Sequence, residues 1–230
     1  MGLAVLMVSM GRLPLLKQSL GTLFDSGFTG RVVVVEQGAT EAGTREWLLT
    51  QPVTTLMLPI NYGKGYAWNV GLKILGEPSL RTGYESPPTH ALFCDDDVVF
   101  SPGWGKAMLE VYSRFFPLGL RALSGFRHVS SDRCPKIGLG GLEVLRQTYC
   151  PGCCLLVAWE HALKHFGAND TQKPIGFVEG PPQKVASAFG CWSGSMVETV
   201  IDHAGAEHRT YRPTPGGFEI RADVVNMPGP

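Results

Sequence analysis

The chain has 230 residues, of which 44% are apolar and 17% charged, and its 20 basic residues balance its 20 acidic residues. This length can bury a substantial core, and the composition is that of a globular protein, which excludes a disordered chain. The net charge of zero argues against a general nucleic-acid-binding surface or capture by an anionic membrane.

The first half of the chain alternates between strand and helix patterns. Residues 3–9 form a continuous apolar run, which is typical of a strand buried on both faces. The pattern predicts further strands at 31–36, 53–58 and from 91 onward, and helices at 13–24, 41–49 and 65–75. Strands separated by helices predict a single-domain α/β fold with a Rossmann-like, mainly parallel central sheet flanked by helices. Such sheets bind ligands at the carboxyl ends of their strands.

The second half of the chain is less regular. A helix is predicted to end at about residue 115, followed by strands at 122–126 and 153–158 and helices at 160–166 and 195–204. Because no domain boundary is visible, we expect one domain over residues 1–230. No secretory signal or bilayer-spanning apolar run is found in the sequence, which predicts a cytoplasmic protein without a transmembrane segment.

The six cysteines are predicted to be thiols and not a disulfide framework, since the chain has no secretory signal. Cys150 and Cys153 have the spacing of half a zinc clip, but no second pair accompanies them. Both a structural zinc and ordinary packing are compatible with this spacing, and packing is the commoner explanation.

Three adjacent aspartates, Asp95, Asp96 and Asp97, follow the predicted strand that begins at residue 91. If the strand continues, Asp95 and Asp97 share one face, because side chains alternate along a strand. Two carboxylates are hard oxygen ligands suited to Mg²⁺ or Mn²⁺, ions that complete their shell with water and substrate phosphates. The alternative is a solvated acidic turn. The position at the end of a buried strand favours a metal-bound diphosphate, whose departure the cation would assist.

Four segments resemble, in order, the motifs of the family 2 glycosyltransferases of GT-A fold. They are VVVVEQGAT at 32–40, NYGKGYAWNVGL at 61–72, LFCDDDVVFSPGW at 92–104, and GCCLLV at 152–157 with EHAL at 160–163. The resemblance is close up to about residue 115 and loose beyond. It implies a nucleotide-sugar-binding half at 1–115, an acceptor-binding half at 116–230, and transfer from a nucleotide sugar, with a UDP-sugar favoured.

The resemblance also implies roles for single residues on the donor side. Ser9 would lie beside the base, and Glu36 would accept hydrogen bonds from the base or ribose. Arg12 and Lys64 are each either a phosphate contact or a solvated side chain. Asp96 would lie beside the ribose.

Four further residues receive donor-side roles from the same resemblance. Asn61 and Asn69 would orient the sugar or nucleotide, and Gly65 would let the backbone approach the ligand. Asp97 would be the principal ligand of the metal, together with Asp95.

The sequence departs from the family at the catalytic base. Inverting members use an acid, commonly in a Glu-Asp pair, to deprotonate the acceptor hydroxyl, and this chain has no such pair. Glu198 and then Glu179 are the favoured candidates, with Asp170 and Asp202 further possibilities. An inverting reaction is expected, although the missing pair leaves the stereochemical outcome open.

A third metal ligand in such folds is often a histidine near the C-terminus, for which His208 and His203 are candidates. Two alternatives to glycosyl transfer remain. The first is a sugar-phosphate nucleotidyltransferase, although the glycine-rich phosphate loop that it needs is missing. The second is a catalytically inactive module that binds nucleotide sugars. The acceptor cannot be derived from the sequence.

Overall fold

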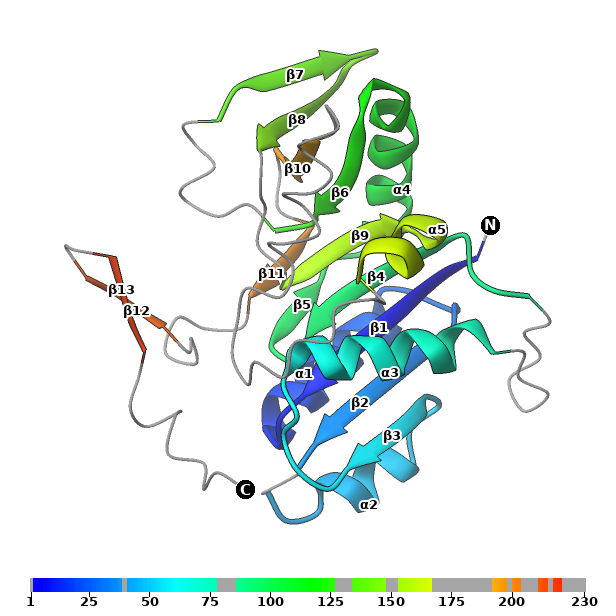
Figure 1. Ribbon diagram of the computed structural model, residues 1–230, viewed down its shortest axis with the longest axis vertical. Helices are drawn as coiled ribbons and strands as arrows, with labels where there is room; N and C mark the ends of the chain where they lie inside the picture. Colours follow the sequence, from blue (N-terminus) through cyan, green and yellow to red (C-terminus); the bar gives the residue numbers. More distant parts are fainter. Residues whose placement is uncertain are drawn as a thin grey trace.

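The computed structural model describes residues 2–38, 41–77, 86–126, 134–147, 153–166, 192–197, 200–203, 211–214 and 217–220 (Figure 1). Nine strands of this described part form one sheet in the order β3-β2-β1-β4-β9-β6-β10-β8-β7. In chain order they are β1 (Leu3–Ser9), β2 (Val32–Gln37), β3 (Thr54–Leu58), β4 (His90–Asp95), β6 (Leu120–Ser124), β7 (Lys136–Leu139), β8 (Leu142–Gln147), β9 (Cys154–Ala158) and β10 (Trp192–Met196).

The sheet is mixed, which corrects the expectation of a mainly parallel one. The four strands of the first half, β3, β2, β1 and β4, are parallel to one another. Beyond β4 the direction changes, because β9 lies antiparallel between β4 and β6. β10 is parallel to β6 but antiparallel to β8, and β7 and β8 form an antiparallel hairpin. The predicted alternation of parallel strands and helices therefore holds only for the first half of the chain.

Helices cover both faces of the sheet. One face packs against α1 (Leu13–Asp25), α2 (Thr44–Leu49) and α4 (Trp104–Phe115). The other face packs against α3 (Lys64–Gly76) and α5 (Trp159–His161), which continues as a π-helical turn at Ala162–Phe166. Figure 1 shows α3 crossing in front of β1 and β2. None of the helices in the described part is long and apolar enough to cross a membrane.

The approach of α3 to the sheet depends on a glycine. A side chain added at Gly71 would begin 2.3 Å from Leu6 Cδ1 of β1, well inside the distance that carbon atoms tolerate. The opposite end of α3 is fixed by Arg31, whose guanidinium donates to the carbonyl oxygens of Ile74, Leu75 and Glu77. These contacts hold the helix in one position and thereby fix its first turn at the carboxyl edge of the sheet.

The structure contradicts the predicted helix at 195–204 and shows strands that the sequence pattern did not predict. The segment forms the end of β10 and all of β11 (Ile201–His203). The apolar residues of this segment have helical spacing, but β10 pairs with β6 on one side and with β8 on the other. This pairing, in which Ser193 and Ser195 are buried, outweighs the local preference for a helix. β7 and β8 were unpredicted because the face of β7 is largely exposed.

Two small sheets complete the described part. β5 (Val98–Phe100) pairs antiparallel with β11, so that His203 lies opposite Val98 in the register. β12 (Tyr211–Thr214) pairs with β13 (Gly217–Ile220). The first of these sheets returns the late part of the chain to the segment that follows Asp97.

Candidate functional site

Polar residues gather where the parallel strands of the first half end. β1 ends at Ser9, which is the register partner of Glu36 near the end of β2. β4 ends at Asp95, whose register partner on β1 is Val8. The carboxyl ends of neighbouring parallel strands lie at one edge of the sheet, so these residues are close together although they are distant in sequence.

The three aspartates do not share one face. β4 ends at Asp95, and residues 96 and 97 form a turn into β5. Asp95 lies on the α3 face, where Lys64 Nζ is 2.7 Å from its Oδ1. Asp96 and Asp97 lie beside Arg12. The alternation expected for a continuing strand therefore does not apply, because the strand stops one residue too early.

Arg12 forms a fork across two carboxylates. Its Nη1 donates to Asp97 Oδ2 at 2.9 Å, and its Nη2 donates to Asp96 Oδ1. Burial alone would lower the pKa of the guanidinium, but the charges of Asp96 and Asp97 outweigh burial and raise it. Arg12 is therefore a permanent cation. Its attraction for Asp96 and Asp97 offsets part of the free-energy cost of burying their two negative charges.

Asp96 is the most enclosed of the three carboxylates. Its side chain is 1% exposed, and it also accepts a hydrogen bond of 3.3 Å from Met10 N. Burial raises the pKa of Asp96, Arg12 lowers it, and the neighbouring charge of Asp97 raises it again. The net direction is upward, so the energetic cost of enclosing this acid exceeds the benefit of its arginine partner.

Ser9 and Glu36 form a buried polar pair at the ends of β1 and β2. Both residues are buried, with exposures of 0% and 1%. Burial raises the pKa of Glu36, the nearby Ser9 hydroxyl lowers it, and the charge of Asp96 raises it. Within the part of the chain that the structure describes, Ser9 Oγ and the two Glu36 carboxyl oxygens make no hydrogen bond of good geometry. Buried oxygens of this kind are usually satisfied by water or a ligand.

The loop after β3 contacts the ends of β1 and β2. Tyr62 N donates to Gln37 Oε1 at 3.2 Å, and Asn61 Nδ2 lies 3.1 Å from Met10 Sδ. Asn61 Oδ1 accepts from Gly63 N at 2.8 Å, which shapes the entry into α3. The loop passes so close to Gly38, which has a φ of +62°, that a side chain there would meet Ile60 Cα at 3.1 Å.

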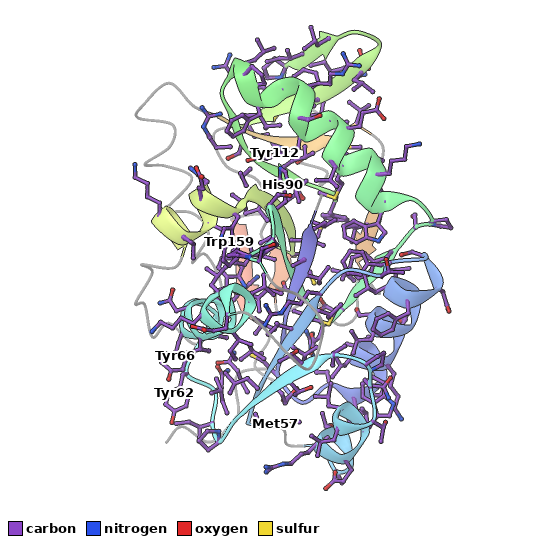
Figure 2. All side chains as sticks on the ribbon, turned by 90° about the vertical axis from the view of Figure 1, so that its right-hand side faces the viewer. Met57, Tyr62, Tyr66, His90, Tyr112 and Trp159 are labelled. Carbon is purple, nitrogen blue, oxygen red and sulfur yellow. The ribbon has the colours of Figure 1, made fainter. Side chains whose placement is uncertain are left out.

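The first turns of α3 hold the remaining donor-side candidates. Gly65 is buried in the first turn, and Asn69 lies one turn further along, half-buried. Tyr62 and Tyr66 stand next to each other at this end of the helix, with ring centroids 4.9 Å apart (Figure 2). Lys64 also lies 5.1 Å from the centre of the Trp68 ring, so it is held by two partners and not simply solvated.

The carboxylates fit a divalent cation by their chemistry. Hard oxygens at the edge of a sheet suit Mg²⁺ or Mn²⁺, and such ions need only one or two protein carboxylates when phosphate oxygens and water supply the rest. Within the described residues there is no group of three or more His, Cys, Asp or Glu side chains arranged as a complete metal site. A cation would therefore depend on its ligand for part of its coordination shell.

Several sequence-based candidates lie outside the described residues. They are Glu179, Glu198 and His208, together with Asp170 and Cys150. The backbones of Asp202 and His203 belong to β11, but their side chains are not described. Cys153 is a buried free thiol, and the contact with Cys154, followed by burial, raises its pKa.

Sequence reasoning missed Ser19 and Gln37. Ser19 on α1 is fully buried, and its hydroxyl donates to Val98 O at 2.6 Å and accepts from Val98 N at 2.9 Å. It therefore fixes the residue directly after Asp97. The available signal was a serine within the apolar stripe of the helix. Gln37 carried no comparable signal, because its role depends on the loop after β3.

The fold is similar to that of the GT-A glycosyltransferases. Of the solved structures, 178 chains match. One of them is described as the crystal structure of GalNAc-T7 with UDP, GalNAc and Mn²⁺. It superposes with a TM-score of 0.63 at 9% sequence identity, over 89% of this chain and 44% of that chain.

The present chain thus spans less than half the length of this structural neighbour. No family model matches the sequence. No curated protein sequence matches it either. The structural likeness establishes the fold alone, and membership of family 2 remains a resemblance.

Proposed function

We propose that this protein is a metal-dependent glycosyltransferase that moves a sugar from a nucleotide diphosphate sugar, with UDP-sugars favoured, to an acceptor hydroxyl. The observation that carries the proposal is the acidic turn at the carboxyl edge of the sheet. Three carboxylates there meet two cations, Arg12 and Lys64, beside the buried Ser9 and Glu36, whose side-chain oxygens make no hydrogen bond of good geometry within the described residues. A nucleotide with a charged diphosphate matches this combination.

The two parts of the site would take different parts of the donor. Glu36 and Ser9 are buried acceptors at the ends of β2 and β1, suited to hydroxyl or N–H groups of the ribose or base. Asp95 and Asp97 would hold the cation, with Asp96 toward the ribose. When bound, Mn²⁺ or Mg²⁺ would neutralise charge on the departing diphosphate. Lys64 and Arg12 are near enough to the carboxylates to add positive charge at the same place.

The choice of donor and metal is motivated by the structural neighbour, whose description includes UDP, GalNAc and Mn²⁺. At 9% identity that likeness cannot transfer a ligand from one protein to the other, so UDP and Mn²⁺ are the first compounds to test. Glu198, and after it Glu179, are our candidates for the base that deprotonates the acceptor in an inverting reaction.

The test uses the purified full chain and a panel of nucleotide sugars, with and without Mn²⁺. Release of the nucleoside diphosphate, through transfer or slow hydrolysis, should require both the cation and Asp97. Asp97→Asn should lower the rate by at least about 100-fold, a loss in the range measured when one electrostatic contact to a leaving group is removed. Asp25→Asn, an exposed acid at the end of α1, is the matched control and should keep the wild-type rate.

Three outcomes would contradict the proposal in different ways. Release of pyrophosphate from a nucleoside triphosphate and a sugar phosphate would indicate a nucleotidyltransferase. Tight nucleotide-sugar binding without any turnover across acceptors would indicate a binding module. Unchanged activity and unchanged donor affinity in Asp97→Asn would reject the metal-bound diphosphate itself.

A further inference from the structure

The Arg12 guanidinium fills the space in front of two buried carboxylates. It contacts Asp96 and Asp97 at the same time. The side chains of these aspartates are only 1% and 5% exposed, and the guanidinium occupies one carboxyl oxygen of each. A metal ion bound to Asp97, one of its two proposed ligands, would compete with Arg12 Nη1 for Asp97 Oδ2, because two cations cannot occupy one position.

Arg12 lies before the first turn of α1, with its side chain partly exposed to solvent. It precedes α1 at a non-helical backbone conformation, with φ −99° and ψ 69°, and its side chain is 29% exposed. Its Nε is buried and has no hydrogen-bond partner among the described residues. The side chain thus borders solvent and has a spare donor, and the planar fork of arginine suits a phosphate as well as a carboxylate.

Lys64 provides the contrast. Its ammonium group is held by Asp95 at 2.7 Å and lies over the ring of Trp68. It is the first residue of α3, a helix whose far end is fixed by Arg31. Of the two cations at the acidic turn, Arg12 has the more exposed side chain, at 29% against 16%, and Lys64 is the one that also packs on an aromatic ring.

The charges at the acidic turn indicate which partner Arg12 would take once a divalent cation binds the carboxylates. The carboxylates of Asp95, Asp96 and Asp97 carry three negative charges, and Arg12 and Lys64 carry two positive charges, which leaves one negative charge. A diphosphate adds at least two more negative charges, whereas a divalent cation turns the balance to one positive charge. Once the cation is on the carboxylates, the diphosphate is the acidic partner that remains for Arg12.

A separate feature marks this place as a ligand site. Ser9 and Glu36 are more than nine-tenths buried beside Asp96, and their side-chain oxygens make no hydrogen bond of good geometry within the described part. Buried oxygens of this kind are completed by water or by a ligand, which makes the place beside Arg12 suitable for a polar ligand.

We propose that Arg12 is an exchangeable counter-ion, which closes the acidic turn in the free protein and passes to the donor's diphosphate when a divalent cation binds the carboxylates. The inference rests on the proposed function. Arg12 then opposes the cation in the absence of nucleotide and supports the nucleotide in its presence. A residue that only stabilises the fold would not produce effects of opposite sign.

The experiment measures two affinities on the full chain. Mn²⁺ binding without nucleotide is followed by the electron paramagnetic resonance signal of the free ion, and UDP binding at saturating Mn²⁺ is followed by calorimetry. Arg12→Met should bind Mn²⁺ about tenfold more tightly and UDP about tenfold more weakly than the wild type, within the usual range of coupling between sites. Lys17→Met removes an exposed charge of the same helix, which lies over Trp47, and should change neither affinity.

Arg12→Lys guards against loss of folding in the methionine variant. It keeps one positive charge but cannot span both carboxylates, so it should show changes of the same signs, each about threefold. A fall or no change in Mn²⁺ affinity in folded Arg12→Met or Arg12→Lys would overturn the exchange while leaving the proposed function intact. If wild-type and Lys17→Met chains bind no UDP with Mn²⁺, the proposed function fails, and the transfer of Arg12 fails with it.

Discussion

The two halves of the sheet are built by different means. In β3, β2, β1 and β4 every strand is parallel to its neighbours, and the candidate site lies where these strands end. In β9, β6, β10, β8 and β7 the direction changes repeatedly, and buried serines replace part of the apolar pattern. The first half owes its structure to local sequence periodicity, whereas the second depends on which strand lies next to which. The strands of both halves nevertheless form one continuous sheet. Whether the two halves also unfold together can be tested.

The largest effect is expected for a large buried apolar residue from each half of the chain. Trp68 is fully buried and packs on Phe93 with ring centroids 4.8 Å apart, and Leu145 is buried in β8. Trp68→Ala should cost about 3–5 kcal/mol and Leu145→Ala about 2–5 kcal/mol of unfolding free energy. Urea denaturation should show a single transition in each variant. Two separate transitions would show that the halves fold independently and would break the continuity of the sheet.

A smaller effect is expected where α1 holds the acidic turn. Ser19→Ala would leave the backbone N–H and C=O of buried Val98 without their side-chain partner, which should cost about 1–3 kcal/mol. Ser113→Ala is the control, since this exposed serine donates to the carbonyl oxygen of Glu110 in its own helix. Nucleotide affinity should fall in Ser19→Ala alone. Equal stability in both variants would show that the turn is fixed by its strand pairing and not by α1.

The next effect has the opposite sign. Because burial raises the pKa of Glu36, the folded protein holds this proton more tightly than the unfolded chain does. Ionisation of Glu36 therefore costs stability progressively as pH rises from the ordinary value of 4.5 through the raised folded pKa.

Glu36→Gln should remove this loss, so the variant should gain stability relative to the wild type between pH 4.5 and 7 in thermal unfolding. Its nucleotide affinity should fall, since a carboxylate acceptor is lost. Glu46→Gln, at an exposed position of α2, should show neither change. A variant that is less stable than the wild type at pH 7 would contradict the assigned direction of the pKa.

The smallest effect is expected on the β7–β8 hairpin. Lys136 and Glu143 form an ion pair of 3.6 Å with side chains that are 54% and 52% exposed. Lys136→Met should change stability by less than about 0.5 kcal/mol, because exposed pairs contribute little. Repeating the measurement at high salt should leave the difference between the two proteins unchanged. A loss above about 1 kcal/mol would mean that this outer edge is under tighter constraint than its exposure indicates.

Most of the first half could be predicted from the sequence for a physical reason. The run Val32–Val35 and the apolar segment at 3–9 are buried on both faces. Short apolar runs of this kind predict strands in the interior of a parallel sheet. The position of Asp95, Asp96 and Asp97 at a strand end followed from the same pattern. The sequence pattern did not predict that Asp95 pairs with Lys64 while Asp96 and Asp97 pair with Arg12. This arrangement depends on β4 ending at Asp95 and on side chains brought from elsewhere in the chain.

The second half resisted prediction because its strands are defined by their neighbours. The sequence Trp-Ser-Gly-Ser-Met of β10 has little β-propensity, and it is a strand because β6 and β8 flank it. The roles of Glu198, Glu179 and His208 stay predictions, and so does the family. Ser9 and Glu36 are an example: the sequence indicated a polar position at each strand end, but not that both side chains would be buried.

The pairing of β5 with β11 has a consequence for how the protein reaches its working form. Val98, one residue after Asp97, lies opposite His203, so the segment that shapes the acidic turn is completed by residues synthesised about a hundred positions later. A ribosome-bound chain that ends near residue 150 would already contain all four parallel strands and yet lack this partner. Competence to bind a donor should accordingly arise only after β11 has been synthesised and has paired with β5.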